Sequence, residues 1–169
     1  FMPNGFVNVE PIIMKPESYS RLENNLMMFY LGGTHSASAI LKEQSKNVQV
    51  VDKATVQKKM CDIARSLKNE LQNNNVDAMG ELLHENWMLK RSLASGISNP
   101  LIDDTYELAV KAGAAGGKLL GAGGAGFMLF YVPEEKHDTV RKALSHLREM
   151  EFEMDNSGAS IVMTDRDFI

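Results

Sequence analysis

Four glycines fall within six residues of this chain, directly before an apolar run that no polar residue interrupts. The glycines are Gly121, Gly123, Gly124 and Gly126, and the run is residues 127–132, FMLFYV. A short run of this kind predicts a central strand that is covered on both faces. Because a strand and not a helix follows the glycines, they are not a dinucleotide-binding turn. No Gly-Lys-Ser or Gly-Lys-Thr closes them either, which excludes the phosphate loop of P-loop enzymes.

The glycine segment leaves two interpretations open. Glycine adopts positive φ and lets a backbone approach a ligand closely, and consecutive amides can form a concave surface that binds phosphate. Alternatively, the glycines make a tight connection between residues 118–120, which have strand character, and the strand at 127–132. The composition of the segment does not distinguish a ligand-binding loop from a tight turn.

The rest of the chain mixes expected strands with expected helices. Apolar and β-branched runs predict three further strands, at residues 6–14, 26–31 and 161–163. Apolar residues at spacings of three and four predict helices near residues 35–48, 52–72, 76–93 and 134–148. This order predicts an α+β fold, a ferredoxin-like antiparallel sheet packed against helices, with a helical insertion in its middle.

One more helix has clear start and stop signals. Asn99 can cap its first turn and Pro100 suits the first helical position, while Gly113 ends it. We expect the face formed by four residues of this helix to point inward: Leu101, Thr105, Leu108 and Ala109. The glycine segment follows this helix almost at once.

Length, composition and charge fit a single domain, residues 1–169. The fractions of hydrophobic residues, 44%, and of charged residues, 24%, are close to the averages for globular proteins. Eighteen basic residues stand against 22 acidic ones, so no strong positive field is available for a nucleic acid, and we expect no nucleic-acid partner. The single cysteine, Cys61, cannot form an internal disulfide, and no apolar run is long enough to cross a bilayer. We therefore expect a cytoplasmic protein without a membrane partner.

The histidines and the small polar residues give no independent site. His84, His137 and His146 are not spaced with acidic residues as metal ligands are, so we expect no metal site. Thr34 follows the Gly32-Gly33 pair at the end of an apolar run, where ligand contacts often occur. Capping of the helix expected after it explains Thr34 equally well.

A family resemblance covers nearly the whole chain. Residues 97–133, ISNPLIDDTYELAVKAGAAGGKLLGAGGAGFMLFYVP, resemble the third signature motif of the GHMP superfamily (galactokinase, homoserine kinase, mevalonate kinase) together with the preceding helix. The segments NVEPI, LMMFYLGGTHSASAIL and ENWMLKRSL are similar to the same group. Within the superfamily, the similarity is to bacterial heptose 7-phosphate kinases and fucokinase-like relatives. The resemblance is specific in the glycine segment and more general elsewhere.

The resemblance implies the C-terminal domain of a two-domain kinase, which transfers the terminal phosphoryl group of ATP to a sugar or sugar phosphate with Mg²⁺. It implies that one loop reaches into the cleft for substrate and ATP: Gly121, Ala122, Gly123, Gly124, Ala125 and Gly126. It also implies a substrate contact near Thr34 and His35, although His35 stands where an arginine is usual. Ala125 replaces a usual glycine, which is tolerable if its φ is negative.

The ATP-phosphate loop and the catalytic acid of the family match nothing in this sequence. We therefore assign no catalytic residue, and we interpret the chain, which opens on Phe1-Met2, as a fragment without the N-terminal domain. Phosphoryl transfer depends on positioning and on cations, so we expect the fragment alone to be inactive and to bind no cofactor. The face that meets the N-terminal domain would leave apolar surface for self-association. The competing hypothesis is a stand-alone ferredoxin-like module that binds a small molecule or regulates another protein.

Overall fold

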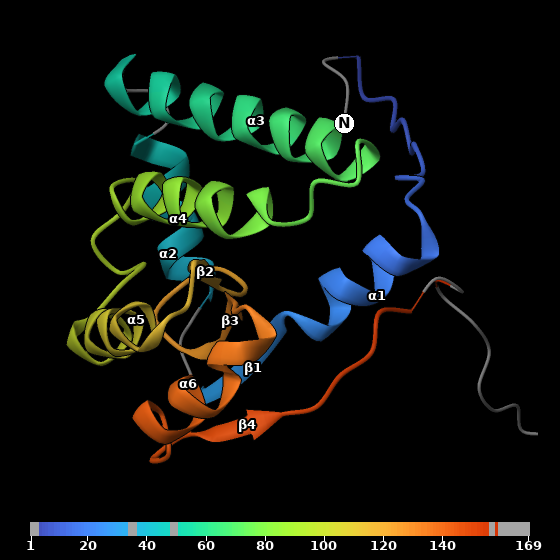
Figure 1. The fold of residues 1–169 in the computed structure, drawn as a ribbon. Helices are drawn as coiled ribbons and strands as arrows, with labels where there is room; N and C mark the ends of the chain where they lie inside the picture. The colour runs from blue at the N-terminus through green and yellow to red at the C-terminus, as the bar shows by residue number, and fades with distance from the viewer. Residues whose placement is uncertain (1–3, 34–36, 48–50, 156–157, 159–169) are drawn as a thin grey trace, which may run out of the picture.

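The computed structural model describes residues 4–33, 37–47, 51–155 and 158, and its centre is a four-stranded antiparallel sheet (Figure 1). The strands are β1 (Leu26–Gly32), β2 (Gly116–Leu119), β3 (Gly126–Tyr131) and β4 (Arg148–Met150). Their spatial order is β2-β3-β1-β4, the order of the ferredoxin-like β-α-β-β-α-β arrangement. The predicted α+β fold with an antiparallel sheet is confirmed.

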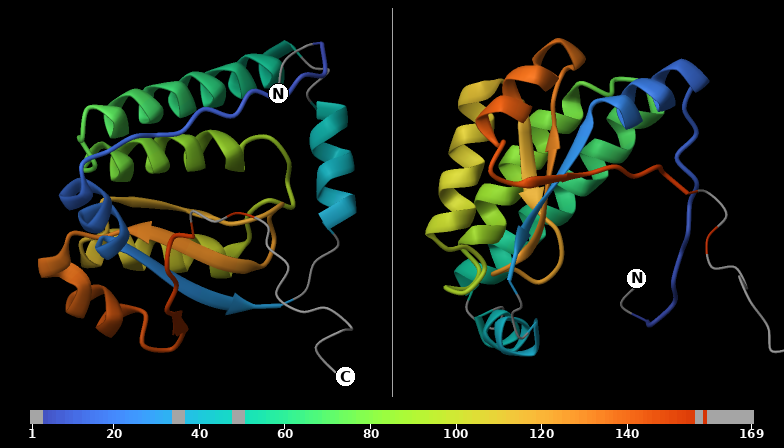
Figure 2. Two further views of the ribbon diagram at one scale, coloured as in Figure 1. Left: turned by 90° about the vertical axis from the view of Figure 1, so that its right-hand side faces the viewer. Right: turned by 90° about the horizontal axis from the view of Figure 1, so that it is seen from below.

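Helices make up most of the remaining described chain. They are α1 (Pro16–Asn24), α2 (Ala37–Asn47), α3 (Val51–Gln72), α4 (Ala78–Arg91), α5 (Pro100–Ala112) and α6 (His137–Ala143), the last preceded by the short 3₁₀ helix η1 (Glu134–Lys136). Four of them, α2 to α5, lie between β1 and β2 in the sequence, which confirms the predicted helical insertion. In Figure 2, α3 and α4 run side by side beyond the β2 edge of the sheet.

One face of the sheet carries the main core, and the described helices cover the other face only near Tyr131. Met27 and Phe29 of β1 and Met128 and Phe130 of β3 form the main core with α5 and α6. On the opposite face, the rings of Tyr30 and Phe127 lie 5.0 Å apart, and Tyr30 is 39% exposed. The strand β3 is central in the sheet as expected. Its second face is buried at Tyr131 but only half-buried at Phe127 and Leu129, so the prediction that both faces are covered is confirmed at one end of the strand alone.

The helix α5 begins and ends where the sequence predicts. Asn99 caps it, because its Oδ1 accepts a hydrogen bond from the Ile102 amide at 3.1 Å, and Gly113 ends it with a φ of 117°. Thr105 and Ala109 are buried as expected. Leu101 and Leu108 are not, since they are 49% and 42% exposed. The buried residues start one position later: Ile102, Thr105, Tyr106 and Ala109. The spacing of three and four residues fits both faces, so only the packing distinguishes them.

Two other predictions are wrong and one is not tested. Residues 6–14 form no strand, and Val9 is 85% exposed, because no described strand lies beside this segment to pair with it. The helix α1 follows this segment, with Pro16 in its first turn. The last predicted helix ends at Ala143, and residues 148–150 pair with β1 instead. The strand expected at 161–163 lies outside the described residues.

The Tyr106 hydroxyl makes the folding stability depend on pH in the alkaline range. It accepts a hydrogen bond from the Gly117 amide and lies 2.7 Å from His84 Nδ1, and burial raises the pKa of Tyr106 to about 12. Between pH 10 and 12 the unfolded chain therefore loses this proton while the folded chain keeps it, so folding stability falls as the pH rises. We expect the Tyr106 hydroxyl to lower the free energy of unfolding by up to about 2 kcal/mol over that range.

Urea unfolding at pH 9.5 and pH 11.5 checks this expectation. The variant Tyr106→Phe should lose less free energy of unfolding between the two pH values than the wild type does. Tyr30→Phe is the control for the loss of a tyrosine hydroxyl from the protein surface. Equal losses in the wild type and Tyr106→Phe would contradict the expectation.

Candidate functional site

The glycine segment is a six-residue loop that joins β2 to β3. The Leu120 amide donates to the Phe127 carbonyl at 2.8 Å and closes the loop at its base. All four glycines of the loop have positive φ, between 80° and 126°, which other residues rarely adopt. Among the described residues Asn74 is the single non-glycine residue with positive φ, so Ala125 meets the condition for replacing a glycine.

One side of the loop packs on the segment that leads into α5. The Gly124 amide donates to the Ile97 carbonyl at 3.0 Å, and Asn99 Nδ2 donates to the Gly124 carbonyl at 2.9 Å. A Cβ added to Gly123 would lie 2.7 Å from Ile97 Cα. Close packing therefore explains part of the glycine content, as the tight-connection interpretation supposed.

Two side chains hold the loop by its carbonyl groups. Lys90 Nζ donates to the Gly121 carbonyl at 2.6 Å, and Asn99 donates to the Gly124 carbonyl. In a trans peptide the C=O and the following N–H point in opposite directions. The N–H groups of Ala122 and Ala125 consequently point away from Lys90 and Asn99.

Most amides of the loop donate to no described protein group, although Gly123 itself is buried. Within the part of the chain that the structure describes, four of them donate to no other protein group: the amides of Gly121, Ala122, Gly123 and Ala125. Adjacent free amides of this kind bind anions such as phosphate. The loop is thus anchored by its carbonyls and presents its amides.

A pocket of about 240 Å³ opens beside the loop. Three elements line it: the end of β1 with Leu31, Gly32 and Gly33, the start of α5 with Asn99, Leu101 and Ile102, and the loop residues Gly124 and Ala125. The partial positive charge at the start of α5 adds to the effect of the loop amides. This pocket is therefore suited to a small ligand that carries an anionic group.

The segment between α4 and α5 is held by its own polar contacts. Ser98 Oγ donates to Asp103 Oδ1 at 2.6 Å, and Arg91 pairs with the same carboxylate at 3.0 Å. The sequence indicated Asn99 only as a helix cap and did not indicate Lys90 at all. No local pattern relates either residue to a loop that lies 25 to 31 positions away.

The structure adds little on the predicted substrate contact and on metal binding. Thr34 and His35 lie outside the described residues, so their substrate contact stays a prediction. In the described ranges, no group of three or more His, Cys, Asp or Glu residues could hold a metal ion. No helix in those ranges is long and apolar enough to cross a membrane.

Comparison with protein families gives one match, the family described as GHMP kinases C terminal, over residues 67–151. The chain is 28% identical over 153 residues to the bifunctional fucokinase/GDP-fucose pyrophosphorylase of Arabidopsis thaliana. It is 29% identical over 146 residues to the D-glycero-alpha-D-manno-heptose 7-phosphate kinase of Campylobacter jejuni. The matches cover 89% and 85% of this chain but only 14% and 42% of those two proteins.

Solved structures show the same fold. The Methanococcus jannaschii mevalonate kinase matches with a TM-score of 0.61 and 27% identity, over 81% of this chain and 42% of that protein. A putative sugar kinase from Campylobacter jejuni matches with a TM-score of 0.57 and 25% identity, over 88% and 41%. The L. major mevalonate kinase, at 21% identity, has a TM-score of 0.66 over 72% of this chain and 37% of that protein, and supports the fold alone.

Substitutions at two glycines separate the packing role of the loop from its backbone conformation. Gly121→Ala places a methyl group in open space at a φ of 86°, which should cost about 1–2 kcal/mol of folding free energy. Gly123→Ala, at a φ of 126°, adds a collision with the Ile97 backbone and should cost about 1–3 kcal/mol more. Urea unfolding of both variants measures the difference. Equal costs would show that the loop does not pack on Ile97 as described.

Proposed function

Because the chain belongs to the GHMP kinase C-terminal family, we propose that it forms one side of the active-site cleft of an ATP-dependent sugar or sugar-phosphate kinase. The observation that carries the proposal is the glycine loop, Gly121 to Gly126. Two of its carbonyls are anchored, four of its amides have no described acceptor, and one of these four, that of Ala125, belongs to a residue that lines an open pocket. Donors fixed in advance stabilise the charge that develops on a phosphoryl group without reorganising during the reaction. The loop is the part of this chain that can supply such donors.

Sugars or sugar phosphates are the proposed substrate class. The two curated relatives are named as a fucokinase and a heptose 7-phosphate kinase, and each matches at least 85% of this chain. The mevalonate kinases match this chain through the fold at 21% to 27% identity. The volume of the pocket beside the loop, about 240 Å³, suits part of a small phosphorylated sugar.

The other half of the site is proposed to come from an N-terminal domain of the same chain. The family reaction uses ATP and Mg²⁺, and the described residues offer no cluster of acids or histidines that fits a metal ion. We therefore assign no magnesium ligand here and derive no step through the metal. What this chain contributes is the binding and orientation of the phosphorylated ligand by the loop amides. We expect the complete enzyme to work in the cytoplasm, and this domain alone to have no activity.

A single charge placed in the pocket tests the proposal. Ala125 lines the pocket opposite Gly33 and does not have positive φ, so a polar side chain of modest size can replace it. In the protein encoded by the complete gene, Ala125→Asp should raise the KM for the phosphorylated substrate or for ATP at least about tenfold, because like charges repel in a partly enclosed site. Ala125→Asn has nearly the same shape without the charge and should change these constants far less.

The measurement is ADP release with heptose 7-phosphate, fucose and mevalonate as candidate acceptors. Equal KM values for the Asp and Asn variants would remove the loop from the phosphate-binding site. Tight binding of one metabolite by the 169-residue chain alone, with no turnover by the complete protein, would favour a stand-alone binding module.

A further inference from the structure

Two lysines lie on α4 and β2, which pack against each other beside the glycine loop. Lys90 lies in the last turn of α4, and Lys118 lies on β2, three residues before Gly121. Both side chains are half-buried. Burial, and then the neighbouring charge of Lys118, lower the pKa of Lys90. Across the described ranges, no ion pair involves either lysine.

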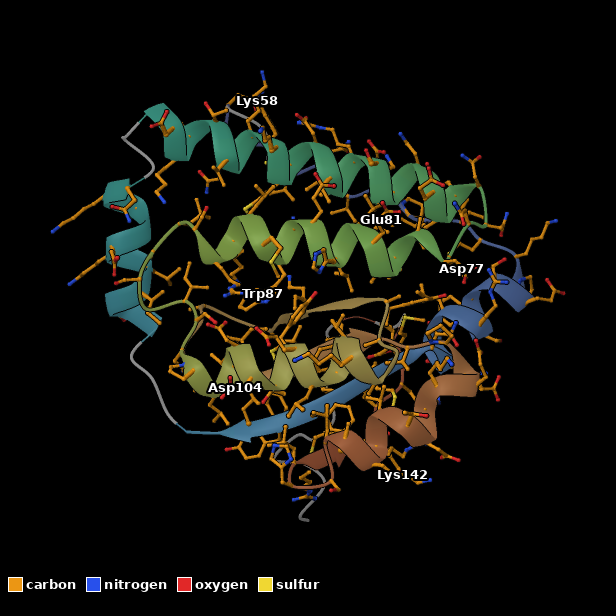
Figure 3. The ribbon with its side chains drawn as sticks, turned by 60° about the vertical axis from the view of Figure 1, so that its left-hand side comes forward. Lys58, Asp77, Glu81, Trp87, Asp104 and Lys142 are labelled. Carbon is orange, nitrogen blue, oxygen red and sulfur yellow. The ribbon has the colours of Figure 1, made fainter. Side chains whose placement is uncertain are left out.

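Among the described residues, most other lysines and arginines are exposed or form an ion pair. Lys53 is also half-buried without an ion pair and donates to the Ser92 carbonyl, whereas Lys90 has a second cation, Lys118, as a neighbour. Arg91, the residue after Lys90, is about as buried but pairs with Asp103 at 3.0 Å. Lys58 and Lys142 form no such pair, but they project from the outer sides of α3 and α6 into solvent (Figure 3). Two partly desolvated like charges cost folding free energy unless an opposite charge joins them. Uncompensated charges of this kind are concentrated at functional sites.

We propose that Lys90 and Lys118 form an anion-binding subsite at the β2 end of the glycine loop, and that it takes the phosphate group of the substrate. The identity of the ligand as a phosphorylated sugar rests on the proposed function. The lysine pair by itself requires only a phosphate dianion. One N–H of the Lys90 ammonium binds the Gly121 carbonyl, which leaves two N–H donors on Lys90 and three on Lys118. A dianion near both groups replaces one repulsion with two attractions.

The subsite is distinct from the pocket near Ala125. Lys90 holds the loop at Gly121, whereas the pocket is lined by Gly124 and Ala125 at the other end of the loop. The free amides of Ala122 and Gly123 lie between the two ends in the sequence. A ligand with an anionic group at each end could therefore contact the loop along its length, and the two ends can be tested separately.

Titration of the 169-residue chain with inorganic phosphate tests the subsite. We expect saturable shifts in the NMR signals of the Gly121 and Ala122 amides, with sodium chloride at equal ionic strength as the reference. Lys118→Gln should weaken phosphate binding at least about fivefold, and Lys118→Arg should retain most of it. Lys111→Gln is the matched control, because Lys111 is exposed on α5 and pairs with Glu107. It removes the same charge and should leave phosphate binding unchanged.

Measurements of unfolding and of kinase activity distinguish the possible outcomes of this test. Lys118→Gln should unfold at the same or a higher urea concentration than the wild type, because it removes a repulsion, so lost binding cannot be attributed to misfolding. Absence of saturable phosphate binding in the wild type would overturn the subsite. So would equal weakening by Lys118→Gln and Lys111→Gln. Phosphate binding in a complete protein with no kinase activity would instead overturn the proposed function and leave the subsite standing.

Discussion

The contact between the glycine loop and the segment that enters α5 is the constraint on which the site depends. Asn99 caps α5 with its side-chain oxygen and holds the Gly124 carbonyl with its side-chain nitrogen. Gly123 lies so close to Ile97 that a Cβ there would collide with the Ile97 backbone. The start of a helix, a hairpin loop and the end of β1 are thereby fixed around one pocket. A rigid arrangement of this kind gives backbone donors a defined direction, which catalysis of phosphoryl transfer requires.

The glycine loop satisfies both interpretations of its sequence. Gly123 and Gly124 are buried and serve packing, whereas Gly121 is exposed and a Cβ there would meet nothing. The hydrogen bonds that anchor the loop turn the free amides of Ala122 and Ala125 away from Lys90 and Asn99. Close packing on one side is therefore the means by which the other side becomes available to a ligand.

The main hydrophobic core and the candidate site lie in different regions of the fold. Helices α5 and α6 cover one face of the sheet and build the main core. The loop and the pocket lie where β1 ends and β2 turns into β3, at the margin of that core. The half-buried lysines Lys90 and Lys118, which form no described ion pair, lie beside the loop at this margin. Separation of core and site allows the loop to keep unsatisfied donors at little cost to folding.

The sequence by itself determined the features that depend on neighbouring residues. Periodic apolar residues predicted most helices, the run at 127–132 predicted the central strand, and Asn99 and Gly113 marked the ends of α5. Only the tertiary structure decided which face of α5 is buried, that residues 6–14 pair with no described strand, and that Lys90 and Asn99 hold the loop. These features depend on contacts between residues far apart in the chain, and local propensity and spacing carry no information about such contacts.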